Sequence, residues 1–290
     1  MRLRCAISPD ADDRFMFRAI EHELIDLEGL SFELVARDTE ALNVMASDGG
    51  DPPHVTAISI AHYPAIAGRY RLLNHGGSVG RGYGPVLIAR PEDAPRLRVS
   101  LRGARIAVPG VRTTACLTLR LLHHATPDDP VFTPIVVPID PPALTFDALR
   151  DPAGGLDAAL VIHEGRLTYA AEGFELIEDI GATWAARTGL PLPLGGNVIR
   201  RDLPPEVLAI ANRVLHASIA HALADREGAI RWLLSRPGPL RTPALVDHYL
   251  SLYANADTLD YGDDGRLAIA RILTDGAQAG WLSPCTVDVL

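Results

Sequence analysis

Short apolar runs alternate with amphipathic segments over the first two thirds of the chain. Each run is about 4 to 8 residues long, the length of a strand that is buried on both faces. The runs predict strands at residues 3–7, 31–36, 54–59, 85–89, 105–108, 131–138, 158–162 and 174–180. Between them, apolar residues at helical spacing predict helices at residues 15–24, 39–46, 113–123, 143–149 and 182–187. This alternation is typical of an α/β fold with largely parallel sheets.

The last third of the chain has helical periodicity alone. Two prolines open a long helix, since proline suits the first helical positions, and apolar residues then recur with the period of an amphipathic helix. Helices are predicted at residues 204–234, 243–254 and 265–279.

Two proline-punctuated segments divide this pattern. Residues 91–102 are polar and basic, which indicates a linker, and PLPLGGN at 191–197 indicates a rigid crossover. We therefore expect two lobes that are joined twice, with residues 1–90 and 197–290 in one and 91–196 in the other. A cleft between such lobes is the usual place for a small-molecule site, and the lobes would close over the ligand.

Composition narrows the class of protein. The net charge of -9, without a basic run, argues against a nucleic-acid partner. The three cysteines lie far apart and predict neither a disulfide framework nor a metal site. The amino terminus has acidic residues before any long apolar stretch, and the sequence lacks an apolar run of membrane-spanning length. We expect a cytoplasmic protein without a membrane partner; the oligomeric state stays open.

His163 is the first candidate for chemistry. It follows the predicted strand at 158–162, and in open α/β sheets the carboxyl ends of strands face the ligand crevice. A histidine titrates near neutrality and is therefore suited to act as a general base. A structural histidine can occupy the same place, so position alone leaves both roles open.

Thr113 and Thr114 stand at the predicted start of a helix. A threonine there commonly caps the helix, but two hydroxyls beside unpaired N–H groups also form a site for a carboxylate or phosphate.

Glycines punctuate residues 76–84, GGSVGRGYG. The segment lacks the lysine of a phosphate loop and precedes a strand instead of a helix, which argues against nucleotide binding. We expect a tight chain crossing that glycine permits, and a crossing beside the cleft would bring Gly82 and Tyr83 near a ligand.

Several longer motifs occur together and in order along nearly the whole chain. They are SPDADDRFMF, SIAHYP, GGSVGRGYGPVLIA, VPGVRTTA, LVIHEGRLTY, TGLPLPLGG followed by Arg200 and Arg201, and YANADTLDYGDDGR. In these motifs the chain resembles the 1,4-dihydroxy-6-naphthoate synthase family.

The resemblance implies a two-lobed fold like that of the type 2 periplasmic binding proteins. It also implies a carbon–carbon lyase of the futalosine route to menaquinone that needs no cofactor. Such an enzyme splits cyclic dehypoxanthine futalosine into 1,4-dihydroxy-6-naphthoate and dihydroxyacetone.

The same resemblance assigns roles to residues. His163 corresponds to the base, and Ser59 with Thr113 or Thr114 to the ligand contacts; Asp13, Gly82 and Tyr83 complete the expected substrate-binding set. We expect His163, neutral at working pH, to remove a hydroxyl proton and start a retro-aldol-like cleavage that aromatisation drives forward. The helix start at Thr113 and Thr114 would hold the substrate carboxylate.

The chain departs from the family in two segments. Where the family usually has SPCPND, this chain has Ser8, Pro9, Asp10, Ala11, Asp12 and Asp13. The added negative charge would disfavour an anionic substrate if this loop lines the cleft. His62 is either a second titrating group of the cleft or a structural residue.

Two other functions compete with the synthase. One is a cytosolic binding protein for a small carboxylate, and the other is a chorismate dehydratase-like enzyme on the same fold. The IHEGRLTY and LPLPLGG motifs favour the synthase.

Overall fold

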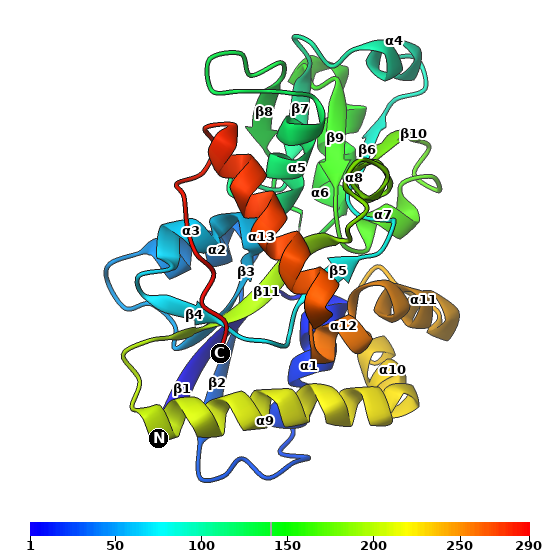
Figure 1. Ribbon diagram of the computed structural model, residues 1–290. Coiled ribbons are helices and arrows are strands. Elements are labelled where there is room, and N and C mark those ends of the chain that lie inside the picture. Colours follow the sequence, from blue (N-terminus) through cyan, green and yellow to red (C-terminus); the bar gives the residue numbers. More distant parts are fainter. Residues whose placement is uncertain (140) are drawn as a thin grey trace.

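The computed structural model describes residues 1–139 and 141–290, and the described residues form two β-sheets with helices packed around them (Figure 1). The first sheet has the strand order β2 (Ser31–Ala36), β1 (Arg2–Ile7), β3 (Val55–Ser59), β11 (Leu192–Arg200) and β4 (Tyr70–Leu72), and β5 (Ser78–Gly80) also pairs with β11. The second sheet has the order β10 (Glu175–Asp179), β6 (Val86–Ala89), β9 (Ala158–Val161), β7 (Arg105–Val108) and β8 (Thr133–Val136).

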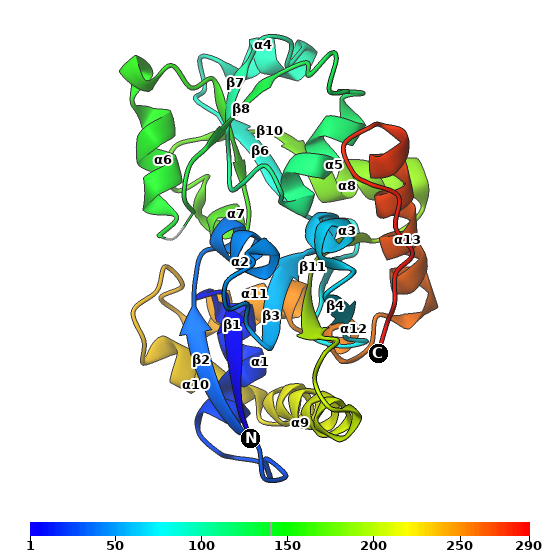
Figure 2. The same cartoon turned by 90° about the vertical axis from the view of Figure 1, so that its left-hand side faces the viewer.

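Each sheet forms one lobe with its helices. Lobe 1 contains α1 (Ala11–Glu21), α2 (Thr39–Ser47), η1 (Ile60–His62), α3 (Tyr63–Ile66), α9 (Pro205–Ala224), α10 (Arg226–Leu234), α11 (Pro243–Tyr253), α12 (Ala256–Leu259) and α13 (Gly262–Gln278). Lobe 2 contains α4 (Ala94–Val99), α5 (Thr114–Leu122), α6 (Ala143–Arg150), η2 (Pro152–Gly154), α7 (Gly165–Thr168) and α8 (Ile180–Thr188). Figure 2 shows lobe 2 above lobe 1 from a second direction.

Both sheets are mixed, so the expectation of largely parallel sheets is wrong. Strand β1 runs parallel to β2 and β3, but β11 is antiparallel to β3, β4 and β5. In the second sheet, β6 is antiparallel to both β9 and β10. The antiparallel strands are those that enter a sheet directly from the other lobe.

The segment PLPLGGN lies largely within a strand, although its prolines and glycines predicted an irregular crossover. Residues from Leu192 onward belong to β11, and the register shifts once, between Pro193 and Gly195. A Cβ atom on Gly196 would overlap with the buried hydroxyl of Tyr261. Glycine is therefore used here for close packing against a ring, not for a turn.

Two other predicted segments also differ. The expected linker at 91–102 contains the helix α4. The expected single helix at 204–234 is broken at Asp225, whose backbone leaves the helical region and whose side chain accepts a hydrogen bond from Gly228 N at 3.2 Å. This capping bond starts α10 as a separate helix.

The chain passes between the lobes at two places that touch one another. Since β6 belongs to the second sheet and β11 to the first, the passages lie at residues 81–85 and 189–191, whereas we expected lobe boundaries at 90 and 197. Gly80, just before the first passage, pairs with Leu192, just after the second. A Cβ atom on Gly84 would lie 3.0 Å from Leu192 Cδ2 and 2.9 Å from the Cα atom of Gly181 in α8. The glycine-rich segment is thus the tight crossing that its composition predicted.

Helix α9 is the one described helix that is long and apolar enough, by length and composition, to cross a membrane. In this fold it packs along α1, and Val214, Leu215 and Ile219 are buried there with Met16 and Phe17. The apolar face of α9 is therefore part of the core of lobe 1.

Candidate active site

A cavity of about 740 Å³, including the space open to solvent, lies between the lobes. Lobe 1 lines it with Ser8, Asp10, Asp12, Asp13, Thr39, Leu42, Ala57, Ile58, Ser59, Gly76, Ser78, Leu194, Gly195, Gly196 and Tyr253. Pro85 from the first passage and Thr113, Thr114, Ala115, Ile162 and His163 from lobe 2 complete the wall. Of the predicted site residues, this cavity brings together His163, Ser59, Thr113, Thr114 and Asp13.

His163 lies at the carboxyl end of β9, as its position in the sequence predicted. Its φ angle of 51° is in the left-handed region, which is uncommon for a residue other than glycine and often marks a functional site. The side chain is 24% exposed, and its Nδ1 atom lies 2.5 Å from Oδ2 of Asp10. Asp10 belongs to lobe 1, so this contact joins the two lobes.

Asp10 changes the expected protonation state of His163. Burial by itself lowers the pKa of the imidazole, but the adjacent Asp10 carboxylate outweighs burial and raises that pKa to about 10. The pKa of Asp10 is lowered in spite of its own burial, because His163 is its partner. With Asp10 in contact, His163 is therefore an imidazolium at neutral pH, which differs from our expectation of a neutral histidine.

Three further carboxyl groups surround this ion pair. Burial and the charge of Asp10 raise the pKa of Asp12, and they raise that of Asp13 well above its usual range. The same causes raise the pKa of Glu164 to about 7. Asp13 accepts a hydrogen bond from Ser8 N at 2.6 Å, and Asp12 accepts one from the Tyr249 hydroxyl at 2.7 Å. The raised pKa values shift these three acids toward their protonated forms, which reduces the negative charge that the sequence suggests for this region.

The start of α5 uses both of its threonine hydroxyls within the protein. Thr113 Oγ1 accepts from Cys116 N at 3.2 Å and donates to Gly110 O at 2.7 Å, so Thr113 caps the helix. Thr114 Oγ1 donates to Leu194 O at 2.6 Å and accepts from Ala61 N at 3.1 Å, which ties lobe 2 to lobe 1. Within the described part of the chain, the N–H groups of Thr114 and Ala115 have no recorded acceptor. An anionic ligand would bind to these backbone groups.

Ser59, at the end of β3, is held in the cavity wall by Asn43. Asn43 Nδ2 donates to the Ser59 hydroxyl at 3.1 Å, and its Oδ1 accepts from Ser59 N at 2.9 Å. The hydroxyl keeps its own hydrogen for a ligand. His62 instead contacts Ser47 Oγ at 2.7 Å and does not line the cavity; burial lowers its pKa to about 4. The geometry supports the structural interpretation of His62.

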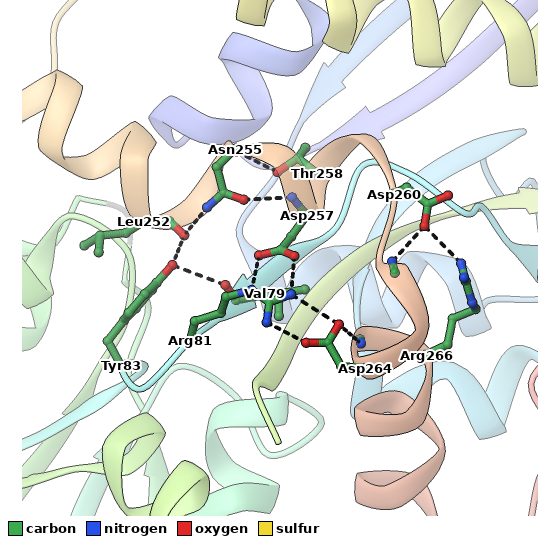
Figure 3. A network of polar contacts seen from close by, with 12 residues as sticks. Val79, Arg81, Tyr83, Leu252, Asn255, Asp257, Thr258, Asp260, Asp264 and Arg266 are labelled. Carbon is green, nitrogen blue, oxygen red and sulfur yellow. Dashed lines mark hydrogen bonds and ion pairs between the residues drawn. The ribbon is translucent and has the colours of Figure 1, made fainter. Parts of the chain in front are cut away.

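Gly82 and Tyr83 lie outside the cavity wall, contrary to the predicted site. Tyr83 and Arg81 belong to a polar network that joins the first passage to residues 252–266 (Figure 3). Arg81 forms ion pairs with Asp257 and Asp264, both at 2.6 Å, while the Tyr83 hydroxyl contacts the carbonyl of Leu252. The ring of Tyr83 packs edge-on against Tyr253, with 6.0 Å between centroids. Tyr253, which the sequence did not single out, lines the cavity in its place.

A second cavity, of about 810 Å³ including open space, adjoins the first and shares Ser8, Asp10, Thr39 and His163 with it. Its other walls include Arg14, Arg236 and the segment 237–240. The Asp10–His163 pair therefore forms part of the wall between the two cavities.

Two lobes that are joined by two passages and enclose a polar cavity define the architecture of a periplasmic-binding-protein-like protein. The solved structure of a Candida albicans protein described as having that generic fold has a TM-score of 0.71 at 13% identity, and the alignment covers 100% of this chain and 96% of that one. The chain belongs to the family described as menaquinone biosynthesis, which matches residues 3–278.

Two relatives are similar at the sequence level. A 1,4-dihydroxy-6-naphthoate synthase of Thermus thermophilus is 36% identical over 97% of this chain and 96% of its own length. The crystal structure of protein AF1704 from Archaeoglobus fulgidus is also 36% identical, covers 97% of this chain and 98% of that one, and has a TM-score of 0.84. The resemblance seen in the motifs is thus confirmed over the full length.

Proposed function

We propose that this protein is a 1,4-dihydroxy-6-naphthoate synthase, a cytoplasmic carbon–carbon lyase that acts on cyclic dehypoxanthine futalosine without a cofactor. Membership of the menaquinone biosynthesis family and the full-length similarity to a synthase support the assignment. The observation that carries it is the placement of His163, whose imidazole reaches an enclosed cavity from a left-handed backbone position and is held by a carboxylate.

The geometry suggests how the substrate lies. Its carboxylate binds at the start of α5, because the N–H groups of Thr114 and Ala115 and the positive end of the helix dipole lie there in the cavity wall. The ring system packs against the apolar part of the wall, which includes Leu42, Ile58 and Ile162. The three-carbon portion then extends past His163 toward the second cavity.

Proton transfer and bond cleavage follow from that position. His163 Nε2 removes the proton of the hydroxyl on the carbon that will leave, and the carbon–carbon bond to the ring breaks as this carbon becomes the carbonyl of dihydroxyacetone. The bonding electron pair passes into the ring carbonyl, and the proton on His163 is returned to the ring fragment as it becomes aromatic. The atoms balance without water or a redox partner, and closed lobes protect the intermediate.

The assignment is tested by incubating the purified protein with cyclic dehypoxanthine futalosine and following naphthoate absorbance, with chorismate as the alternative substrate. His163→Ala should abolish turnover, while the substrate should still raise the melting temperature because its other contacts remain. Consumption of chorismate would favour the dehydratase-like alternative. A rise in melting temperature without any product from the wild-type protein would instead identify a binding protein.

A further inference from the structure

The two partners of the Asp10–His163 contact come from different lobes. Asp10 follows the carboxyl end of β1 in lobe 1 and immediately precedes α1. His163 follows β9 of lobe 2. Their 2.5 Å separation therefore depends on how closely the lobes approach one another, unlike a contact within one rigid lobe.

Asp10 is the one carboxylate that touches the imidazole in the described structure. Asp12 and Glu164 also face His163, but the oxygens of Asp12 accept from Tyr249 and Ser78, and Glu164 accepts from Ala11 N at 3.1 Å. Asp10 is 8% exposed, and its second oxygen, Oδ1, has no hydrogen-bond partner among the described residues. His163 is thus the charged partner of this buried carboxylate.

We propose that Asp10 is the positioning residue of His163, delivered from the opposite lobe, so that lobe closure turns the imidazole into a stronger proton acceptor. By accepting from Nδ1–H, Asp10 fixes the tautomer whose lone pair is on Nε2. Its negative charge also stabilises the imidazolium that forms when Nε2 takes a proton. The role as a base rests on the proposed function; the coupling between lobe closure and protonation does not.

This coupling explains why His163 is an imidazolium when it contacts Asp10. With the lobes apart, a histidine lacking a carboxylate partner is largely neutral at pH 7.5 and can enter the reaction as a base. With the lobes together it binds a proton, which comes from the substrate hydroxyl when substrate is present and from solvent when it is absent. Closure and proton uptake are therefore one event.

Other contacts between the lobes do not involve this pair. Arg112 of lobe 2 forms an ion pair with Glu40 of lobe 1 at 2.9 Å, and both groups lie outside the cavity wall. This bridge therefore provides a matched control, because its removal takes away an ion pair between the lobes but keeps the Asp10 carboxylate next to His163.

The test is the titration of His163 by NMR of the labelled imidazole in wild-type protein and in Asp10→Asn, with and without 1,4-dihydroxy-6-naphthoate. In the wild type the midpoint should lie well above neutrality. In Asp10→Asn it should fall to or below that of an ordinary histidine, since burial then acts without a compensating charge. Asp10→Glu and Arg112→Met both keep a carboxylate opposite His163, so both should retain a midpoint above that of an ordinary histidine, unlike Asp10→Asn.

Kinetics provide a second reading. In Asp10→Asn we expect kcat to fall about 10²- to 10⁴-fold with little change in KM, the loss typical of a disabled base. Circular dichroism establishes that each variant is folded. An unchanged His163 midpoint in folded Asp10→Asn, or a wild-type midpoint near that of an ordinary histidine with and without naphthoate, would overturn the proposal. Because titration requires no turnover, its result stands even if the substrate assignment fails.

Discussion

At the scale of single residues, the cavity holds one ion pair among acids whose pKa values are raised. The pKa of Asp10 is lowered by His163, whereas burial and mutual repulsion raise those of Asp12, Asp13 and Glu164. A protonated carboxyl group can donate a hydrogen bond to an anion, which a carboxylate cannot. The acidic loop is therefore compatible with a carboxylate substrate in spite of its composition.

Glu164 makes this arrangement measurable. Its pKa rises from 4.5 to about 7 in the folded protein, so folding favours its protonated form, and the stability that this contributes is lost as pH rises from about 4.5 through 7. Glutamine mimics the protonated form and cannot ionise. Glu164→Gln should therefore exceed the wild type in free energy of unfolding by up to about 3 kcal/mol at pH 8, with the gain vanishing near pH 4.5.

Urea unfolding at the two pH values gives this difference directly. Glu227→Gln, on a side chain that is 92% exposed, makes the same chemical change on the surface and should show no such dependence on pH. A gain for Glu164→Gln that is equal at pH 4.5 and pH 8 would contradict the assigned cause.

The sequence could predict the position of His163, because a histidine that follows a buried strand has a predictable place at the end of an α/β sheet. It could not reveal that Asp10 contacts the ring, since that contact depends on the relative placement of two lobes. The same limit applies to Thr114, whose hydroxyl is used by Leu194 and Ala61 from the other lobe. A residue's type shows its possible chemistry; its partners follow only from the fold.

At the scale of elements, periodicity predicted strands and helices wherever packing agreed with local preference. It failed where tertiary contacts decided, as in β11, whose glycines and proline read as a loop but pair with strands on both sides. The tight crossing before β6 was predicted correctly, because glycine permits close backbone approach wherever the approaching segment lies in the chain.

That close approach predicts a steric effect at Gly181, in the first turn of α8. A Cβ atom there would overlap with the backbone carbonyl of Tyr83, which cannot move as a flexible side chain could. In an unobstructed helix, alanine is more stable than glycine by about 1 kcal/mol. Because of the overlap, Gly181→Ala should instead lower the free energy of unfolding by about 1–3 kcal/mol. Denaturant midpoints measure this loss. Gly68→Ala, at a glycine with open space around it, should change stability by less than about 0.5 kcal/mol; equal effects would refute the contact.

At the scale of the whole molecule, the carboxyl-terminal segment joins the two lobes a third time. Helix α13 packs against α5 of lobe 2. The carboxyl-terminal tail, residues 281–290, then returns to β4 of lobe 1, where the carboxyl terminus lies (Figure 1). Trp281 Nε1 donates to Ala125 O at 2.8 Å, and the Arg120 guanidinium lies 4.0 Å from the centre of the Trp281 ring. At the other end of the tail, Asp288 pairs with Arg71 and Arg201. The resemblance to binding proteins implied two lobes, but the contact of the carboxyl-terminal tail with both lobes is seen only in the structure.

From the contacts of the tail with both lobes we predict that Trp281 limits how far the lobes separate. Trp281→Ala removes the hydrogen bond and the cation–π contact to lobe 2, so the ligand-free protein should show a larger radius of gyration in small-angle X-ray scattering, and naphthoate should restore the compact value. Trp232 provides the matched control, because the Arg236 guanidinium lies over its ring and His22 contacts the ring edge-on, both within lobe 1. Trp232→Ala should reduce stability without changing the radius. If both variants keep the wild-type radius, the tail does not restrain the lobes, and the contacts within the cleft, among them Asp10 with His163, must hold them together unaided.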